Sequence, residues 1–282
     1  MFSLSLKIKQ SQPKITLLIL AMLIFFISDE IRAQNLTKQF KSVVGHSNFI
    51  FLGTVTHVDS SNIAVKLQKK NKAIVRVDEV IDATEPLFRM KGKEITMVFA
   101  SDLNHPKNSK QVFYTFIWYY GSTLGVKEVK NNLEKKFHPQ LSNLIRQSRA
   151  KISDDSLSAE LARAKIVVFA TVKNISEYIP VRGLEQSEHN PKFRKVVFDV
   201  KEVLKGKTKK DSLTAYYASS YDVMWIDSPK LSEGSEGVFL LHDQQTSGFF
   251  EFTGYTLLDP RDFQNSSELK RIKNLLGSLT QK

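Results

Sequence analysis

Two segments far apart in the chain break the alternation of a β-strand in the same way. Val203 follows Val200 at a spacing of three residues, whereas side chains on one face of a regular strand are two or four residues apart. Val77 and Val80 repeat this spacing. The recurrence of the break indicates a structural device that the fold uses twice.

An extra residue inside a strand, a β-bulge, restores the inward face after such a break and bends the strand. We therefore expect bulges at Asp78/Glu79 and at Lys201/Glu202, with Glu79 and Glu202 as the structural bulge residues. A strongly bent strand is what a small closed barrel requires. The two breaks thus predict two barrels.

The segments around the two breaks also repeat in the same order along the chain. Asn48–Val58 is similar to Lys165–Ile175, and Ile95–Ser101 is similar to Leu213–Ser219. Each half contains five strand-like segments, at residues 48–58, 73–81, 93–101, 111–120 and 123–130 in the first and 165–175, 194–204, 211–219, 237–243 and 249–257 in the second. The sequence predicts a mainly β fold of two tandem five-stranded OB-like barrels.

Short helical patterns flank each barrel, at residues 36–44, 139–149, 157–164 and 265–276. Asp154, Asp155 and Ser156 are the expected N-caps of the third pattern, because short polar side chains accept hydrogen bonds from the first N–H groups of a helix. Asn265 is the expected N-cap of the fourth pattern, which we expect to end at Gly277.

The first segment, Met1–Ala33, has the layout of a secretory signal peptide. A basic start precedes Ile15–Ile27, an apolar run that is shorter than the roughly 20 residues a membrane-spanning helix needs. We expect cleavage between Ala33 and Gln34, and an uncleaved N-terminal anchor is the alternative. The remaining chain then forms a first OB-like module, residues 34–150, and a second, residues 151–282.

The chain contains no cysteine, which excludes disulfides, thiol catalysis and cysteine-ligated zinc. Export without cysteine favours a secreted or periplasmic bacterial protein, because small exported eukaryotic domains are usually joined by disulfides. The net charge of +12 suits anionic partners, and it equally suits a chain whose charge only maintains solubility.

Several short motifs together resemble one known family. An aliphatic run leads into G-T-V or A-T-V at Phe49–Val55 and Ile166–Val172, Val200–Gly206 reads V-x-E-V-L-K-G, and Leu231–Leu241 reads L-x-x-G-x-x-G-V-F-L-L. This pattern resembles the OB-fold domain of tissue inhibitors of metalloproteinases and of netrin-like modules, in the form found in exported bacterial proteins. The first half departs from it, since its K-G pair comes only at Lys91-Gly92.

The resemblance implies a fold and little chemistry. The metalloproteinase inhibitors of this family chelate the protease zinc through an N-terminal cysteine, whereas the expected mature N-terminus here is Gln34. That mechanism therefore does not carry over. The resemblance implies instead a domain that binds proteins, glycans or other extracellular polymers.

No catalytic or metal-binding motif is present in the sequence. The six histidines have no ligand spacing such as H-E-x-x-H. His242-Asp243 is the most site-like pair, and we interpret it as the end of an apolar strand. We expect no enzyme activity, no metal and no cofactor.

Two groups of side chains remain as candidates for ligand binding. One is the lysines after the second bulge, Lys205, Lys207, Lys209 and Lys210, which are either a grip for an anionic polymer or solvated loop tips. The other is the aromatic strand residues Tyr216 and Tyr217, which either stack bases or sugars, as in other OB folds, or pack against modules and helices.

These observations favour an exported, non-enzymatic binding protein whose partner is an unknown protein or an anionic polymer outside the cytoplasm. The chain is not expected to be an integral membrane protein once the signal is cleaved. A binder of acidic glycan or nucleic acid, using lysines and aromatics, is the first alternative. A protease inhibitor that acts by loop insertion without zinc chelation is the second.

Overall fold

The structure is a computed structural model, and it describes residues 37–63, 71–85, 87–100, 106–120, 123–130, 133, 136–137, 139–178, 189–208, 211–243 and 254–280. Contacts divide the chain into two compact units, Met1–Ile152 and Ser153–Lys282. The expected cleavage site at Ala33 and Gln34 lies outside the described residues, as do Lys209 and Lys210.

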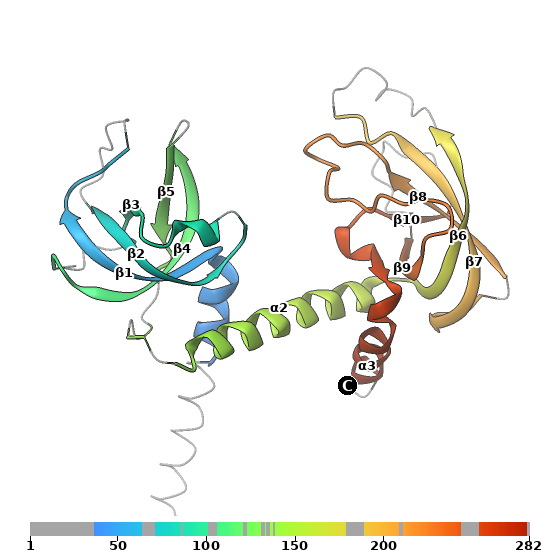
Figure 1. The fold of residues 1–282 in the computed structure, drawn as a ribbon. Helices are drawn as coiled ribbons and strands as arrows, with labels where there is room; N and C mark the ends of the chain where they lie inside the picture. Colours follow the sequence, from blue (N-terminus) through green and yellow to red (C-terminus); the bar gives the residue numbers. More distant parts are fainter. Residues whose placement is uncertain are drawn as a thin grey trace, which may run out of the picture. The chain divides into compact units, whose positions relative to one another are not determined.

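The first unit is a closed five-stranded barrel with the strand order β1-β2-β3-β5-β4 (Figure 1). Its strands are β1 (Phe49–Val58), β2 (Lys72–Ala83), β3 (Glu94–Val98), β4 (Lys110–Tyr120) and β5 (Thr123–Glu128), with the 3-10 turn η1 (Leu87–Met90) between β2 and β3. All neighbours are antiparallel except β3 and β5. Residues 37–46 form a helix before β1.

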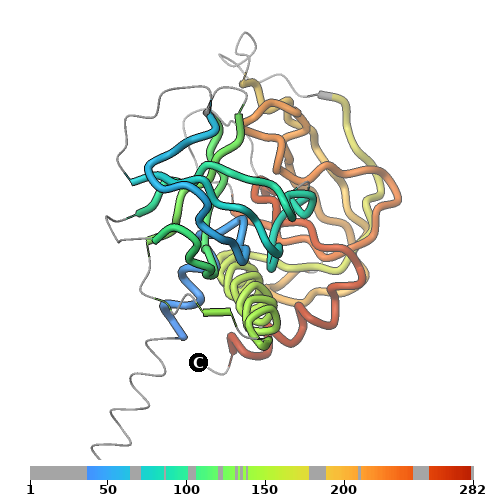
Figure 2. The backbone as a smooth tube through the Cα atoms, turned by 60° about the vertical axis from the view of Figure 1, so that its left-hand side comes forward, coloured from blue at the N-terminus to red at the C-terminus, as the bar shows by residue number. Residues whose placement is uncertain are grey.

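The second unit repeats this topology, and the backbone of each barrel can be followed in Figure 2. Its strands are β6 (Ile166–Tyr178), β7 (Phe193–Lys205), β8 (Ser212–Ala218), β9 (Glu236–Asp243), β10 (Tyr255–Leu257) and β11 (Phe263–Asn265). The strand β10 pairs with both β8 and β9 and so closes the ring, and the β8–β10 pair is parallel like β3–β5. The predicted pair of OB-like barrels is confirmed, and β11 is an addition that pairs with β9.

Each barrel buries one apolar cluster inside and a second outside, under helices. Phe49, Phe51 and Phe113 fill the first barrel, and Phe198 and Phe239 fill the second. The outer clusters lie where the alternate side chains of the same strands meet the flanking helices. This two-sided burial explains why β1 and β9 read as nearly continuous apolar runs, whereas β2 and β7 alternate.

The strand breaks do mark bulges. Leu52 pairs with Glu79 and Gly53 pairs with Val77, so the residue without a partner in the register is Asp78. In the second unit Phe169 pairs with Glu202 and Ala170 with Val200, which leaves Lys201 as the extra residue. The bulges thus lie at the predicted pairs Asp78/Glu79 and Lys201/Glu202, but the extra residue is the first of each pair and not the glutamate, because both glutamates keep their ladder partners.

A single helix, α2 (Leu141–Arg163), replaces the two helices predicted at residues 139–149 and 157–164. The predicted caps Asp154, Asp155 and Ser156 lie inside it, so that assignment was wrong. Residues 147–158 contain no Pro or Gly, and nothing there interrupts helical hydrogen bonding. Asp154 instead accepts a hydrogen bond from Arg271 at 2.8 Å.

The C-terminal helix differs from its prediction at both ends. Asn265 caps the 3-10 turn η3 (Ser266–Glu268) by accepting a hydrogen bond from the Ser267 N–H, and α3 (Leu269–Leu279) follows. The helix continues through Gly277, around which a Cβ atom would meet nothing within 4 Å. Of the helices in the described part of the chain, none is both long and apolar enough to cross a membrane.

Candidate functional site

Lys205, the first of the predicted polymer-binding lysines, is bound by its ammonium group to the end of helix α2. Its ammonium group donates hydrogen bonds to the carbonyls of Leu161, Ala162 and Ala164 at 2.6, 2.7 and 2.7 Å. These carbonyls end helix α2, where the helix dipole favours a cation. All three N–H donors are thus used, and burial lowers the pKa of this ammonium group. Assigning Lys205 to a ligand site was wrong.

The two tyrosines that were predicted to stack on a ligand differ in burial. Tyr217 points into the second barrel and is buried, and burial raises the pKa of its hydroxyl. It therefore offers no face for stacking, and that assignment was wrong as well. Tyr216, its neighbour on β8, is half-buried, and Lys207 is exposed. Of the residues predicted to act together, Lys205 and Tyr217 are therefore used by the fold, and Lys209 and Lys210 lie outside the described residues.

Among the described residues of the second unit, an apolar loop between β8 and β9 is the most exposed hydrophobic feature. Tyr221, Val223, Met224 and Ile226 expose 76, 78, 64 and 52% of their surface. Side chains of this kind normally lie in cores, and a cluster of them on a surface marks an interaction site. We call residues 221–226 the apolar loop.

The apolar loop is held from beneath by polar contacts. Asp222 receives an N–H hydrogen bond from Met224 at 2.9 Å and contacts His189 Nδ1 at 3.0 Å. The Trp225 indole N–H donates to the His189 carbonyl at 2.8 Å, and its ring packs edge-on against buried Phe193 at 6.1 Å. These contacts give the loop a defined shape.

Lys230 fixes the far end of the same loop. Its ammonium group donates to the carbonyls of Trp225, Ser228 and Ala218 at 2.7, 2.9 and 3.2 Å. Burial lowers the pKa of this group, and the nearby Asp227 opposes that change. Lys230 thus ties the C-terminal end of the loop, at Trp225, to Ala218, the last residue of β8.

The first unit has an exposed aromatic pair of its own, at the end of β4. Trp118 and Tyr119 are 43 and 70% exposed. The ammonium group of Lys127 lies 2.8 Å from the centroid of the Trp118 ring, a cation–π contact. Tyr114, in contrast, is buried edge-on against Phe40 of the flanking helix, at 6.3 Å. Packing against helices, the rival explanation for the aromatic strand residues, holds for Tyr114.

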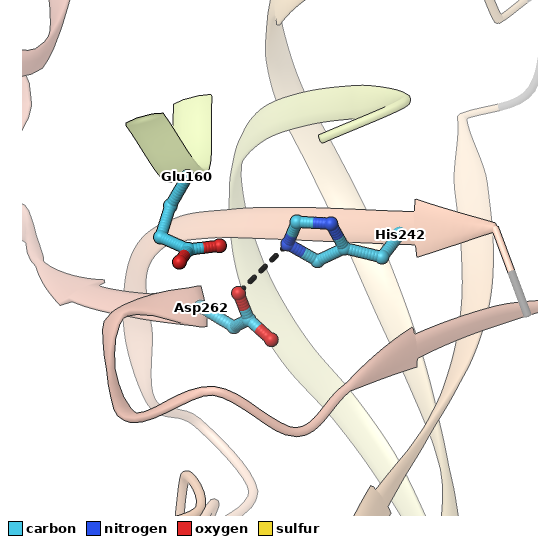
Figure 3. Close-up of side chains that lie close together, drawn as sticks. All are labelled: Glu160, His242 and Asp262. Carbon is cyan, nitrogen blue, oxygen red and sulfur yellow. Dashed lines mark hydrogen bonds and ion pairs between the residues drawn. The ribbon is translucent and has the colours of Figure 1, made fainter. Parts of the chain in front are cut away.

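A polar cluster lies in the second unit where α2, β9 and the 3-10 turn η2 (Pro260–Asp262) meet (Figure 3). His242 Nε2 lies 2.8 Å from Asp262 Oδ1, and one carboxylate oxygen of Glu160 is turned towards this pair. Glu160 and Asp262 are buried, and 21% of the His242 side chain is exposed. The hydrogen bond to Asp262 raises the pKa of His242 against the opposing effect of burial.

His242 does not pair with its sequence neighbour. Asp243 is exposed and faces Lys165, 3.6 Å away. Sequence reasoning missed Asp262 and Glu160 because one lies on a short turn and the other on a helix. The run Asp259–Asp262 has the spacing of a capping box around a proline, and that signal could have marked Asp262 as an ordered carboxylate.

The comparisons with known proteins add no name to these features. No model of a protein family matches the chain, and no curated protein is significantly similar to it.

Proposed function

We propose that this chain is an exported, non-enzymatic binding protein that contacts a protein partner through the apolar loop. The observation that carries the proposal is four exposed apolar side chains within six residues, on a backbone that Asp222, Trp225 and Lys230 hold in place. The signal-like segment Met1–Ala33 supports export to the periplasm or the medium. The family resemblance supports a binding role for OB-like domains.

The composition of the loop suits a protein interface. Aromatic side chains and methionine are enriched in interface cores, where methionine adapts to irregular partner surfaces. A preorganised loop also loses little conformational entropy on binding. The partner surface should therefore be an apolar depression that accepts Val223 and Met224.

The charges around the loop argue against insertion into a lipid bilayer. Asp227 is exposed next to Ile226, and Asp222 lies at the other end of the loop. Anionic headgroups would repel both carboxylates, whereas membrane-binding loops carry lysine or arginine beside their apolar tip. A protein with basic groups at the rim of its apolar pocket fits this arrangement better.

The test is affinity capture of the mature protein from its own cell envelope, followed by reconstitution with the purified captured protein. The loop variant is Val223→Asp/Met224→Asp, and the matched control is Phe88→Asp, because Phe88 is a 53% exposed apolar residue in the first unit. The proposal expects wild type and control to retain the partner and the loop variant to lose at least tenfold in affinity. Equal binding by all three proteins contradicts it.

The same experiment covers the inhibitor alternative. A partner captured through the loop and identified as a protease is assayed for inhibition by wild type and by the loop variant. Hydrolase activity of the purified chain itself, lost on His242→Ala, would contradict the non-enzymatic part of the proposal.

The exposed Trp118–Lys127 contact supports a second candidate, an anionic polymer bound by the first unit. Aromatic side chains beside lysine stack sugars or bases, at about 1–3 kcal/mol per base. Affinity for heparin should then fall steeply with salt and be lost in Trp118→Ala/Tyr119→Ala. An affinity for heparin that does not change with salt concentration excludes this candidate.

A further inference from the structure

The polar cluster in the second unit brings together donor atoms of three residues. Glu160, His242 and Asp262 each offer one ligand atom, and these atoms all lie within 4.8 Å of one another. They come from three separate elements, α2, β9 and η2 (Figure 3). The closed barrel and the helix against it hold these elements together, so the donors are preorganised.

One oxygen of each carboxylate is already occupied. Asp262 Oδ2 accepts the backbone N–H groups of Leu258 and Asp259 at 2.8 and 2.9 Å. Glu160 Oε1 faces the guanidinium groups of Arg163 and, at 3.3 Å, of Arg261. Contacts of this kind fix the orientation of metal-binding carboxylates in proteins and leave the second oxygen for the ion.

The remaining oxygen of Glu160 is an anomaly. Glu160 is only 3% exposed, and its Oε2 atom is buried without a hydrogen-bond partner among the described residues. A buried carboxylate oxygen without a partner is destabilising, so native structures rarely retain one without a reason. An N–H group at His242 Nε2 accounts for the contact with Asp262 Oδ1, but it leaves Glu160 Oε2 without a hydrogen-bond donor. A cation bound between the three donor atoms would contact Glu160 Oε2 as well as the other two.

The charges of the surroundings permit such an ion. The carboxylates of Glu160, Asp259 and Asp262 face the two guanidinium groups of Arg163 and Arg261, so the cluster has an excess of one negative charge when His242 is neutral. The pairing of Arg261 with Asp259, at 2.7 Å, also limits the positive charge that Arg261 presents to the donors.

We propose that Glu160, His242 and Asp262 bind one divalent first-row transition-metal ion, of the zinc class. One imidazole nitrogen with two carboxylate oxygens suits zinc, whereas magnesium and calcium prefer oxygen alone. Three protein ligands leave a coordination position open. Water or a donor group of another molecule can fill it. The ion would join α2 to β9 and η2.

The experiment uses tag-free, full-length mature protein treated with chelator and then titrated with Zn²⁺ by calorimetry and with Co²⁺ by absorption spectroscopy. The proposal expects one equivalent of each metal to bind, visible Co²⁺ bands of low coordination number, and a rise in Tm with Zn²⁺. His242→Ala and Glu160→Gln should each weaken binding at least a hundredfold.

Two matched variants control for incidental binding by surface groups. His189→Ala removes the other His–Asp contact of the unit, which is exposed, and Asp243→Asn removes the carboxylate next to His242 in sequence. Both should bind like wild type. Wild-type protein that binds no Zn²⁺ in the stoichiometric range overturns the proposal. Equal binding by wild type and the two ligand variants also overturns it. The wild-type titration decides even where a ligand variant does not fold.

Discussion

Asp78 and Lys201 occupy the same bulge position in the two barrels and carry opposite charges. Asp78 faces Lys110, which starts β4, at 3.6 Å. Lys201 faces Glu236, which starts the equivalent strand β9. The chain thus retains the ion pair across the bulge in both units while exchanging which strand carries the acid.

The reversal extends to a third position. Thr54 pairs with Arg76 in the first barrel, and Thr171 pairs with Asp199 in the second, so this charge is exchanged too. The threonine remains and donates to whichever carboxylate is present, Asp78 at 2.6 Å or Glu236 at 3.5 Å. In both barrels the bulge residue carries the charge opposite to that of its two neighbours, so electrostatic complementarity constrains the relation between the three charges more than the identity of any one residue.

The first prediction concerns the reversed charges around the two bulges. Asp78→Lys alone places a third cation beside Arg76 and Lys110, and should lower the free energy of unfolding by about 1–3 kcal/mol, the cost of lost charged hydrogen bonds. The triple variant Arg76→Asp/Asp78→Lys/Lys110→Glu imports the pattern of the second barrel and should recover most of that loss. Urea denaturation measures both. A triple variant less stable than the single one contradicts the equivalence.

The second prediction concerns acid stability. Burial of Asp78 pushes its pKa up, but hydrogen bonds from Thr54 and Arg76 and the charges of Arg76 and Lys110 outweigh burial, so the pKa lies below its usual 3.8. The unfolded carboxylate then takes up its proton first as pH falls, and the stabilisation by Asp78 is lost below about pH 4. The stability difference between wild type and Asp78→Asn should shrink from pH 6 to pH 3. A constant difference across this range is the contrary result.

The third prediction separates structural from surface lysines. Lys205→Met keeps the aliphatic stem but leaves the final carbonyls of α2 without their donor, and should cost about 1–3 kcal/mol of stability. Lys207→Met removes an exposed charge two residues later and should change stability by less than about 0.5 kcal/mol. Chemical denaturation of both variants decides. Equal losses would mean that the Lys205 contacts contribute nothing.

The fourth prediction explains the glycine that follows Lys205. Gly206 has a φ of +84°, and a Cβ atom there would lie 2.6 Å from the Lys165 carbonyl oxygen. Gly206→Ala should therefore destabilise the second unit through both backbone strain and the clash, by about 1–3 kcal/mol. Gly234→Ala is the control, because Gly234 shares the positive φ but has open space around it. In thermal denaturation, the Tm of Gly206→Ala should be lower than the Tm of Gly234→Ala.

The barrels could be predicted from sequence because inward side chains must alternate and the breaks recur. The long helix α2 could not, since its polar middle, residues 147–158, lacks the apolar stripe that marks a helix against a core. Glu160 and Asp262 lie 102 residues apart, and only the closed second barrel brings them together. The apolar loop reads in sequence like buried residues, and only its exposure distinguishes it.

The most direct test of the binding role is site-specific photo-crosslinking in living cells, with a photoreactive phenylalanine analogue at position 224 or at position 88. Both sites expose a large apolar side chain, Met224 in the apolar loop of the second unit and Phe88 on the 3-10 turn η1 of the first unit. A partner bound through the apolar loop gives a discrete protein adduct from position 224 that is absent at position 88. An adduct from position 88 alone, or none from position 224, would contradict this binding role.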